Sequence, residues 1–250
     1  MRNVSAIGAW LGRAARRVQP IDGAFLAAPL ALFGILVVAC RWCGADLVVS
    51  RWFYESGRNA WSLSGREPWQ FLYEKGCLPA LLLGAVGLLA AVAGACGRGP
   101  RRWGRCGLFL VATLLLGPGL LVNLALKPYF GRPRPCETAP FGGDKQFVAV
   151  GRGLDRSDSR SFPSGHAAAA FFLATPALLY YRSRPGWAVA TLAAGLGYGT
   201  LMGLARIGQG AHFASDVLAS GFCVQAVATA VLAVVRRGDA LPDWSTTVEH

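Results

Sequence analysis

The stretch Leu78-Pro-Ala-Leu-Leu-Leu-Gly-Ala-Val-Gly-Leu-Leu-Ala-Ala-Val-Ala-Gly-Ala95 contains no charged side chain. At about 1.5 Å per residue, a helix of this length is roughly 27 Å long, which is close to the hydrocarbon thickness of a bilayer. Further apolar stretches lead us to expect six membrane-spanning helices in all. The others cover about Phe25–Cys40, Leu108–Leu126, Ala167–Tyr181, Trp187–Leu204 and Ser215–Val235.

The composition also favours a membrane protein. Of the 250 residues, 54% are hydrophobic and only 15% are charged, which leaves few charges to cover a soluble surface. We therefore predict an all-α, polytopic membrane helical bundle whose single domain covers residues 23–237. A basic segment over residues 1–22, either an amphipathic surface helix or a disordered lead, precedes it, and a tail over residues 238–250 follows.

Basic residues predict the orientation of the bundle. The formal net charge is +12, but the arginines lie in short clusters beside apolar stretches, which argues against a nucleic-acid partner. On the side of the membrane that holds both termini, the connecting segments contain three clusters of arginines that no acidic residue interrupts. These clusters are Arg98, Arg101, Arg102 and Arg105, then Arg182 and Arg184, then Arg236 and Arg237. The positive-inside rule therefore places both termini in the cytoplasm. We expect a bacterial inner (plasma) membrane, with residues 41–77, 127–162 and 205–214 facing the periplasm.

The seven cysteines indicate no fixed pairing. Cys40 and Cys43 form a Cys-x-x-Cys pair, but no second pair and no nearby histidine completes a zinc site. We expect ordinary apolar cysteines and no metal. A disulfide among Cys43, Cys77 and Cys136 is an alternative, because these residues lie on the expected periplasmic side, where conditions would be oxidising.

Two strings on the expected periplasmic side are rich in groups that bind anions. Lys127-Pro-Tyr-Phe-Gly-Arg-Pro-Arg134-Pro135 predicts an exposed turn with three cations, since proline and glycine prevent a continuing helix. Ser161-Phe-Pro-Ser-Gly-His166 opens a predicted helix, where free backbone N–H groups, a hydroxyl and a glycine are typical of an anion site. The alternatives are a snorkelling basic anchor and an ordinary capped helix.

A third string, Arg206-Ile-Gly-Gln-Gly-Ala-His212-Phe-Ala-Ser-Asp216, combines a histidine with a carboxylate. Because His212 and Asp216 are four residues apart, we expect them on one helix face, joined by a hydrogen bond. An aspartate that holds one imidazole nitrogen leaves the other free to act as a nucleophile. A local salt bridge at a helix start is the alternative.

Together the three strings resemble the membrane type 2 phosphatidic acid phosphatase (PAP2) superfamily, which shares its core with vanadium haloperoxidases. The pattern of that family is Lys-x6-Arg-Pro, then Pro-Ser-Gly-His, then Ser-Arg-x5-His-x3-Asp. Both the order and the internal spacing match here. Ala205 departs from the pattern, because the family usually has serine at that position.

The resemblance implies a haloperoxidase-like phosphatase core and hydrolysis of a phosphoric ester or diphosphate through a phosphohistidine. His212 would attack phosphorus, Asp216 would orient His212, and His166 would protonate the leaving group. The phosphate would be bound by Lys127, Arg134, Ser164, Gly165 and Arg206. Such groups supply the charge and the acid that phosphoryl transfer requires, so we expect neither a metal nor another cofactor.

A site at the membrane edge predicts two partners, a phosphorylated membrane lipid as substrate and the bilayer itself. Lipid A, undecaprenyl diphosphate, phosphatidylglycerol phosphate and phosphatidic acid are the candidate substrates. The segment Phe141-Gly-Gly-Asp-Lys-Gln-Phe147 is similar to the corresponding loop of bacterial lipid A phosphatases. The surrounding loop either contacts a polyanionic head group or is merely solvated; its charged residues are Asp144, Lys145, Arg152, Asp155, Arg156, Asp158 and Arg160.

Two other functions stay open at this point. A lipid-to-lipid phosphotransferase would use the same motifs and pass the phosphoryl group to a second lipid. A non-enzymatic transporter or scaffold would keep the fold, but intact His166, His212 and Asp216 argue against it. No oligomeric state follows from the sequence.

Overall fold

The structure, a computed structural model, describes residues 20–151 and 159–237. The predictions for residues 1–19, for Arg152, Asp155, Arg156 and Asp158, and for the C-terminal tail lie outside these ranges.

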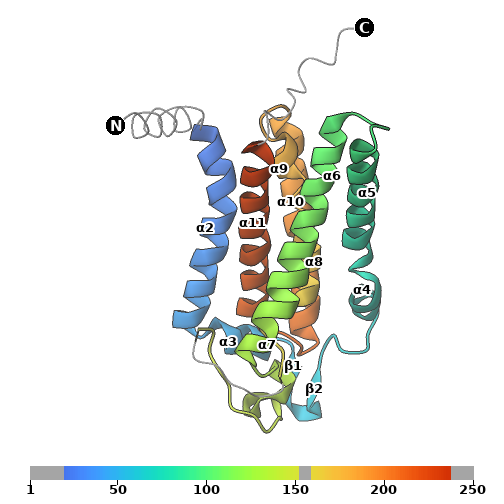
Figure 1. The fold of residues 1–250 in the computed structure, drawn as a ribbon. Coiled ribbons are helices and arrows are strands. Elements are labelled where there is room, and N and C mark those ends of the chain that lie inside the picture. Colours follow the sequence, from blue (N-terminus) through green and yellow to red (C-terminus); the bar gives the residue numbers. More distant parts are fainter. Residues whose placement is uncertain (1–19, 152–158, 238–250) are drawn as a thin grey trace.

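Long apolar helices build the molecule (Figure 1). Within the described ranges, five helical segments are long and apolar enough to cross a membrane. They contain α2 (Pro20–Cys43), α5 (Leu78–Ala95), α6 (Arg101–Leu114) with its π-helical continuation η2 (Leu115–Leu126), α10 (Pro185–Gly208) and α11 (Ala214–Arg237). The predicted all-α membrane bundle is therefore confirmed, and α5 has the expected bounds.

The remaining expected span is shorter than the others. It consists of α8 (Gly165–Phe172) and α9 (Ala177–Tyr180), which a tight turn separates. Ala168, Phe172 and Ala177 have no exposed surface, because α8 packs against η2, α10 and α11, and α9 packs against α10 and α11. This segment is thus enclosed by protein, and the count of six crossings stays a prediction.

The outer surface of the bundle is apolar. Leu82, Leu89, Leu124 and Trp187 each expose 66–71% of their surface. Such a continuous apolar exterior would be unfavourable in water and fits a hydrocarbon environment.

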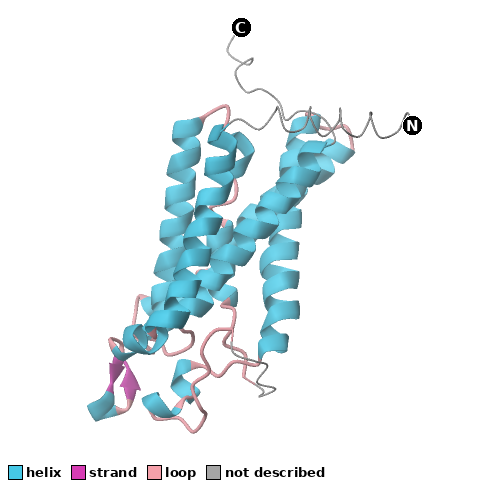
Figure 2. Ribbon diagram, turned by 90° about the vertical axis from the view of Figure 1, so that its left-hand side faces the viewer, coloured by secondary structure: helices cyan, strands magenta, loops and turns pink. Residues whose placement is uncertain are grey.

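Short elements cover the end of the bundle at which α2 ends and α11 begins (Figure 2). Tyr54 and Trp61 pair across a small antiparallel ladder, and both rings pack on Phe141 with centroids 5.2–5.4 Å apart. This contact joins two segments far apart in the chain. The short elements are α3 (Ala45–Arg51), β1 (Tyr54–Glu55), η1 (Ser56–Arg58), β2 (Ala60–Trp61), α4 (Trp69–Lys75), α7 (Lys127–Phe130), η3 (Pro135–Glu137) and η4 (Ala139–Phe141).

Glycines allow α5 and α6 to pack closely. A Cβ atom built on Gly107 of α6 would lie 2.3 Å from the carbonyl oxygen of Gly87 and 2.5 Å from the backbone nitrogen of Ala91, both on α5. Small residues permit this kind of backbone contact within a membrane, where van der Waals packing replaces the hydrophobic effect between helices.

We expect Gly107→Ala to lower the free energy of unfolding by about 1–3 kcal/mol, because rigid backbone atoms surround the added methyl group. Thermal unfolding of the detergent-purified protein measures this loss. Gly197→Ala on α10 is the matched control, since a Cβ there meets no atom within 4 Å. Equal unfolding temperatures for the two variants would contradict the packing argument.

Candidate active site

The three predicted strings meet at one end of the bundle because of the direction of their helices. The α6–η2 helix runs toward this end and delivers Lys127 and Arg134, and α10 ends here with Arg206 in its last turn. Both α8 and α11 begin here, which brings in His166 and Asp216 (Figure 1). His166 lies within electrostatic reach of Lys127, Arg206 and His212.

The start of α8 has the capped geometry that the sequence predicts. Ser164 is the N-cap residue, and its hydroxyl oxygen accepts a hydrogen bond from the backbone N–H of Ala167 at 3.4 Å. Gly165 is required by close packing, because a Cβ there would lie 2.5 Å from Oδ1 of Asn123. The hydroxyl hydrogen of Ser164 is not needed for the cap and is free to be donated elsewhere.

Three cations lie together, and Asp216, a carboxylate within electrostatic reach of Lys127, is already paired with Arg132. Lys127 is within electrostatic reach of both Arg134 and Arg206. Among the described residues, no carboxylate forms an ion pair with any of the three. Like charges at this separation repel one another, so the arrangement favours a bound anion.

Arg206 is held in place by neutral partners. Its Nη1 donates to Oε1 of Gln209 at 2.6 Å, and its guanidinium carbon lies 4.3 Å from the ring centroid of Tyr73. Its Nε is buried and has no hydrogen-bond partner within the described part of the chain. A buried donor of this kind is costly unless a ligand satisfies it.

The geometry of His212 defines its tautomer. Nδ1 lies 2.7 Å from the backbone carbonyl oxygen of Ser161. Because a carbonyl can only accept a hydrogen bond, Nδ1 carries the hydrogen, and the lone pair of the neutral ring is on Nε2. The neutral ring therefore has a lone pair available on Nε2, as a nucleophile requires.

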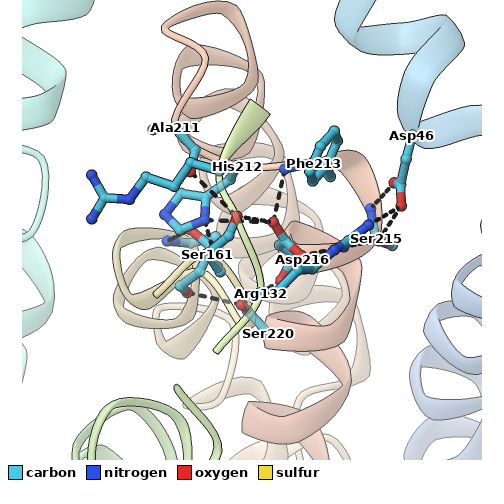
Figure 3. A network of polar contacts seen from close by, with 12 residues as sticks. Asp46, Arg132, Ser161, Ala211, His212, Phe213, Ser215, Asp216 and Ser220 are labelled. Atoms are coloured by element: carbon cyan, nitrogen blue, oxygen red, sulfur yellow. Dashed lines mark hydrogen bonds and ion pairs between the residues drawn. The ribbon is translucent and has the colours of Figure 1, made fainter. Parts of the chain in front are cut away.

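Asp216 contacts His212 differently from the sequence prediction. His212 precedes α11 instead of lying on its first turn, so the four-residue spacing does not place the two on one helix face. Oδ2 of Asp216 is 3.7 Å from Nδ1 of His212, beyond hydrogen-bond range. That oxygen instead accepts hydrogen bonds from the Ser161 hydroxyl at 2.6 Å and from the Phe213 N–H at 2.8 Å (Figure 3). Asp216 thus acts on the ring through charge and through Ser161.

Arg132 differs most from the expectation of an exposed turn. Its side chain is only 4% exposed, and its Nη1 donates to Oδ1 of Asp216 at 2.5 Å. Its Nη2 donates to Oδ2 of Asp46 at 2.7 Å, and its Nε donates to the Val148 carbonyl at 2.8 Å. Sequence reasoning counted Arg132 among the cations of the turn but missed this pairing.

Tyr73 of α4 is a second residue that sequence reasoning missed. Its ring lies over Arg206 and also contacts His166, with the two ring centroids 5.2 Å apart. The helix is tied to the site because Nε2 of Gln209 donates to the Trp69 carbonyl at 3.1 Å. An exposed aromatic residue on a short helix carries no sequence signal for this position.

The loop with the lipid A phosphatase-like segment packs against the site. The ring of Phe147 lies 5.2 Å from that of Phe213, next to His212. Lys145 is held at the base of the loop, because its Nζ donates to Oγ of Ser159 at 2.5 Å and lies 3.4 Å from Oε2 of Glu137. Lys145 therefore has a structural role within the described part of the loop.

The cysteines and other potential metal ligands do not form a further centre. All seven cysteines fall within the described residues, and each is free. In the same part of the chain, no three His, Cys, Asp or Glu side chains are grouped so that they could hold a metal ion.

Curated relatives resemble about half of the chain. The lipid A 4'-phosphatase of Rhizobium leguminosarum is 39% identical over 125 residues, which is 50% of this chain and 52% of the relative. The lipid A 4'-phosphatase of Francisella tularensis subsp. novicida is 38% identical over 134 residues, 52% of this chain and 58% of the relative. That of Rhizobium etli is 37% identical over 130 residues, 50% of this chain and 48% of the relative. The chain thus spans about half the length of the curated relatives that it matches.

No solved structure matches the chain significantly. The PAP2 superfamily matches residues 107–239, a range that contains all three sequence strings. With its apolar helices, the protein is a multi-pass membrane protein, and it belongs to the PAP2 superfamily.

Proposed function

We propose that the protein is an integral membrane lipid phosphatase that hydrolyses a phosphomonoester or pyrophosphate of a lipid head group. The observation that carries this proposal is the group of three cations that form no ion pair with a carboxylate within the described residues. The group lies beside a histidine whose Nε2 carries the lone pair of the neutral ring. Cations stabilise the equatorial oxygens of a phosphoryl group in transfer, and an in-line nucleophile completes the requirement.

The residues suit a two-step transfer through a phosphohistidine. Lys127, Arg134 and Arg206 bind the phosphate oxygens, with help from the Ser164 hydroxyl and the Gly165 N–H. Nε2 of His212 attacks phosphorus, and the bond from phosphorus to the lipid oxygen breaks. Burial and the neighbouring cations lower the pKa of His166 to about 4, and the anionic charge of the bound phosphoryl group favours its protonated form, which donates its proton to the lipid oxygen. Water then attacks phosphorus and gives a proton to His166, the bond from phosphorus to Nε2 of His212 breaks, and inorganic phosphate leaves.

Lipid A is the substrate that we propose first. The curated relatives are named lipid A 4'-phosphatase. The segment from Phe141 to Phe147, whose sequence is similar to a loop of bacterial lipid A phosphatases, packs beside His212 through the contact of Phe147 with Phe213. A phosphorylated sugar lipid carries the anionic group that the three cations fit. Undecaprenyl diphosphate, phosphatidylglycerol phosphate and phosphatidic acid carry the same group and are the competing substrates.

We further propose that the site faces the periplasm of an inner membrane and that both termini are cytoplasmic. The basic clusters around Arg101, Arg182 and Arg236 lie at the ends of α6, α9 and α11 that are opposite the site. The positive-inside rule assigns that end to the cytoplasm.

The first test is phosphate release from a panel of the four lipids by protein purified in detergent with EDTA. We expect release from lipid A by the wild type and a decrease of at least about 1,000-fold in His212→Ala, because this variant lacks the nucleophile. A folded wild-type protein that releases no phosphate from any lipid would contradict the phosphatase proposal. Equal release by His212→Ala would mean that another group is the nucleophile.

Adding an unphosphorylated acceptor lipid to the same reaction separates hydrolysis from transfer. We expect the label of a ³²P-lipid to appear as inorganic phosphate. Its appearance on the acceptor lipid in place of phosphate would identify a phosphotransferase instead.

The protonation of His212 gives a second test. Burial lowers the pKa of His212 below its ordinary value, although the nearby Asp216 carboxylate opposes this shift. A lowered pKa keeps the imidazole neutral, and hence nucleophilic, at pH values where an exposed histidine is already protonated. We expect NMR of ¹⁵N-histidine-labelled protein, assigned with His212→Ala, to detect protonation of this ring only below pH 6.5. Titration at or above that pH would contradict the burial argument.

Native cysteines allow a test of orientation. Cys43 and Cys136 are exposed at the site end, whereas Cys96 is exposed in the α5–α6 connection at the opposite end. In single-cysteine variants, we expect a membrane-impermeant maleimide to label Cys43 and Cys136 in intact spheroplasts. Cys96 should react only after permeabilisation. The reverse pattern would place the site in the cytoplasm.

A further inference from the structure

Asp46 is a buried carboxylate that lies outside the region matched by the PAP2 superfamily. It is located on α3 and is 2% exposed. Its Oδ1 accepts the Ser215 N–H at 2.8 Å, and its Oδ2 accepts both the Ser215 hydroxyl at 2.7 Å and Nη2 of Arg132 at 2.7 Å (Figure 3). Arg132 therefore bridges Asp46 to Asp216.

The charges of this buried group do not cancel. Asp46 and Asp216 contribute two negative charges and Arg132 contributes one positive charge, so one net negative charge remains. It lies beside His212, whose Nδ1 is 3.7 Å from Oδ2 of Asp216. When Nε2 bonds to phosphorus, the imidazole ring becomes cationic, and the remaining negative charge then balances it. Interactions of this kind are strong because they are removed from water.

Arg132 would act differently if it had one carboxylate partner. A guanidinium paired with Asp216 alone would cancel the charge that His212 needs. Because Asp46 accepts a hydrogen bond from Nη2 and Asp216 accepts one from Nη1, the guanidinium is shared between two carboxylates.

We propose that Asp46 is a positioning residue of the active site, which shares Arg132 with Asp216 and so preserves the negative charge that stabilises the cationic ring of His212. The inference rests on the proposed phosphatase function. It adds to that function a residue from the segment that precedes the family match, acting through Arg132 and not on the substrate.

The other charged and titratable groups around His212 stay constant in the test. They are Lys127 from α7, His166 from α8, Arg206 from α10 and Asp216 from α11. Ionisation of the substrate is also common to all variants, so a difference between pH profiles reports the protein.

The experiment measures kcat and KM against pH for Asp46→Asn, with the lipid of the panel that the wild type hydrolyses fastest. Asparagine keeps the size of the side chain and removes its charge. We expect kcat to fall about 10- to 100-fold, as for the loss of one charge-assisted interaction, with KM within about twofold. The acid limb of kcat/KM should move to lower pH, because the protonated form of His212 loses a stabilising charge.

Arg132→Gln provides the opposite arm. Removing the cation makes the electrostatic potential at His212 more negative, which stabilises the protonated ring. The acid limb of kcat/KM for Arg132→Gln should therefore move to higher pH. In the double variant Asp46→Asn/Arg132→Gln, the group again carries one negative charge, and its acid limb should return toward that of the wild type. Ser215→Ala is the matched control: it removes a hydroxyl from the same network without changing charge, and its acid limb should not move.

The outcomes are distinguishable. An acid limb of Asp46→Asn that coincides with that of the wild type would overturn the inference and leave Asp46 with a structural role only. If Asp46→Asn does not fold, the double variant decides, and a displaced acid limb in that variant would overturn the inference. Failure of the phosphatase proposal itself appears earlier, as absence of phosphate release by the wild type.

Discussion

The structure around the site depends on the satisfaction of one buried charge, the carboxylate of Asp216. This residue has no exposed surface, and an unpaired carboxylate in such a place would cost several kcal/mol. Its hydrogen-bond donors come from separate segments: the guanidinium of Arg132, the hydroxyl of Ser161 and the N–H of Phe213. Ser161 also holds the ring of His212 through its carbonyl oxygen. The position of the His212 ring therefore follows from the way in which the carboxylate is stabilised.

The family match and the site do not have the same extent. Residues 107–239 contain the cations, both site histidines and Asp216. The segment before the match adds α3 and α4. Asp46 on α3 pairs with Arg132, and Tyr73 on α4 contacts Arg206 and His166. The superfamily core thus supplies the groups to which we assign the proposed reaction, while preceding elements complete their surroundings.

Local sequence rules predicted the features that depend on neighbouring residues. The bounds of α5 were predictable because its apolar run is continuous, and the N-cap role of Ser164 was predictable because serine satisfies free N–H groups at a helix start. The contact of Arg132 with Asp46 was not predictable, since 86 residues separate them and only the direction of the helices brings them together. The prediction that His212 and Asp216 share one helix face was wrong, because α11 begins after His212. Tyr73 was missed because nothing in its own segment indicates that α4 lies over the site.

The location of the cations at one end of an apolar bundle has a kinetic consequence for the proposed reaction. The two products part into different phases, since inorganic phosphate enters water and the dephosphorylated lipid stays in the bilayer. Inhibition by phosphate would therefore depend on its bulk concentration, whereas competition by the second product would depend on its mole fraction among the surrounding lipids. Diluting the membrane with inert lipid would slow substrate encounter without changing the affinity for free phosphate.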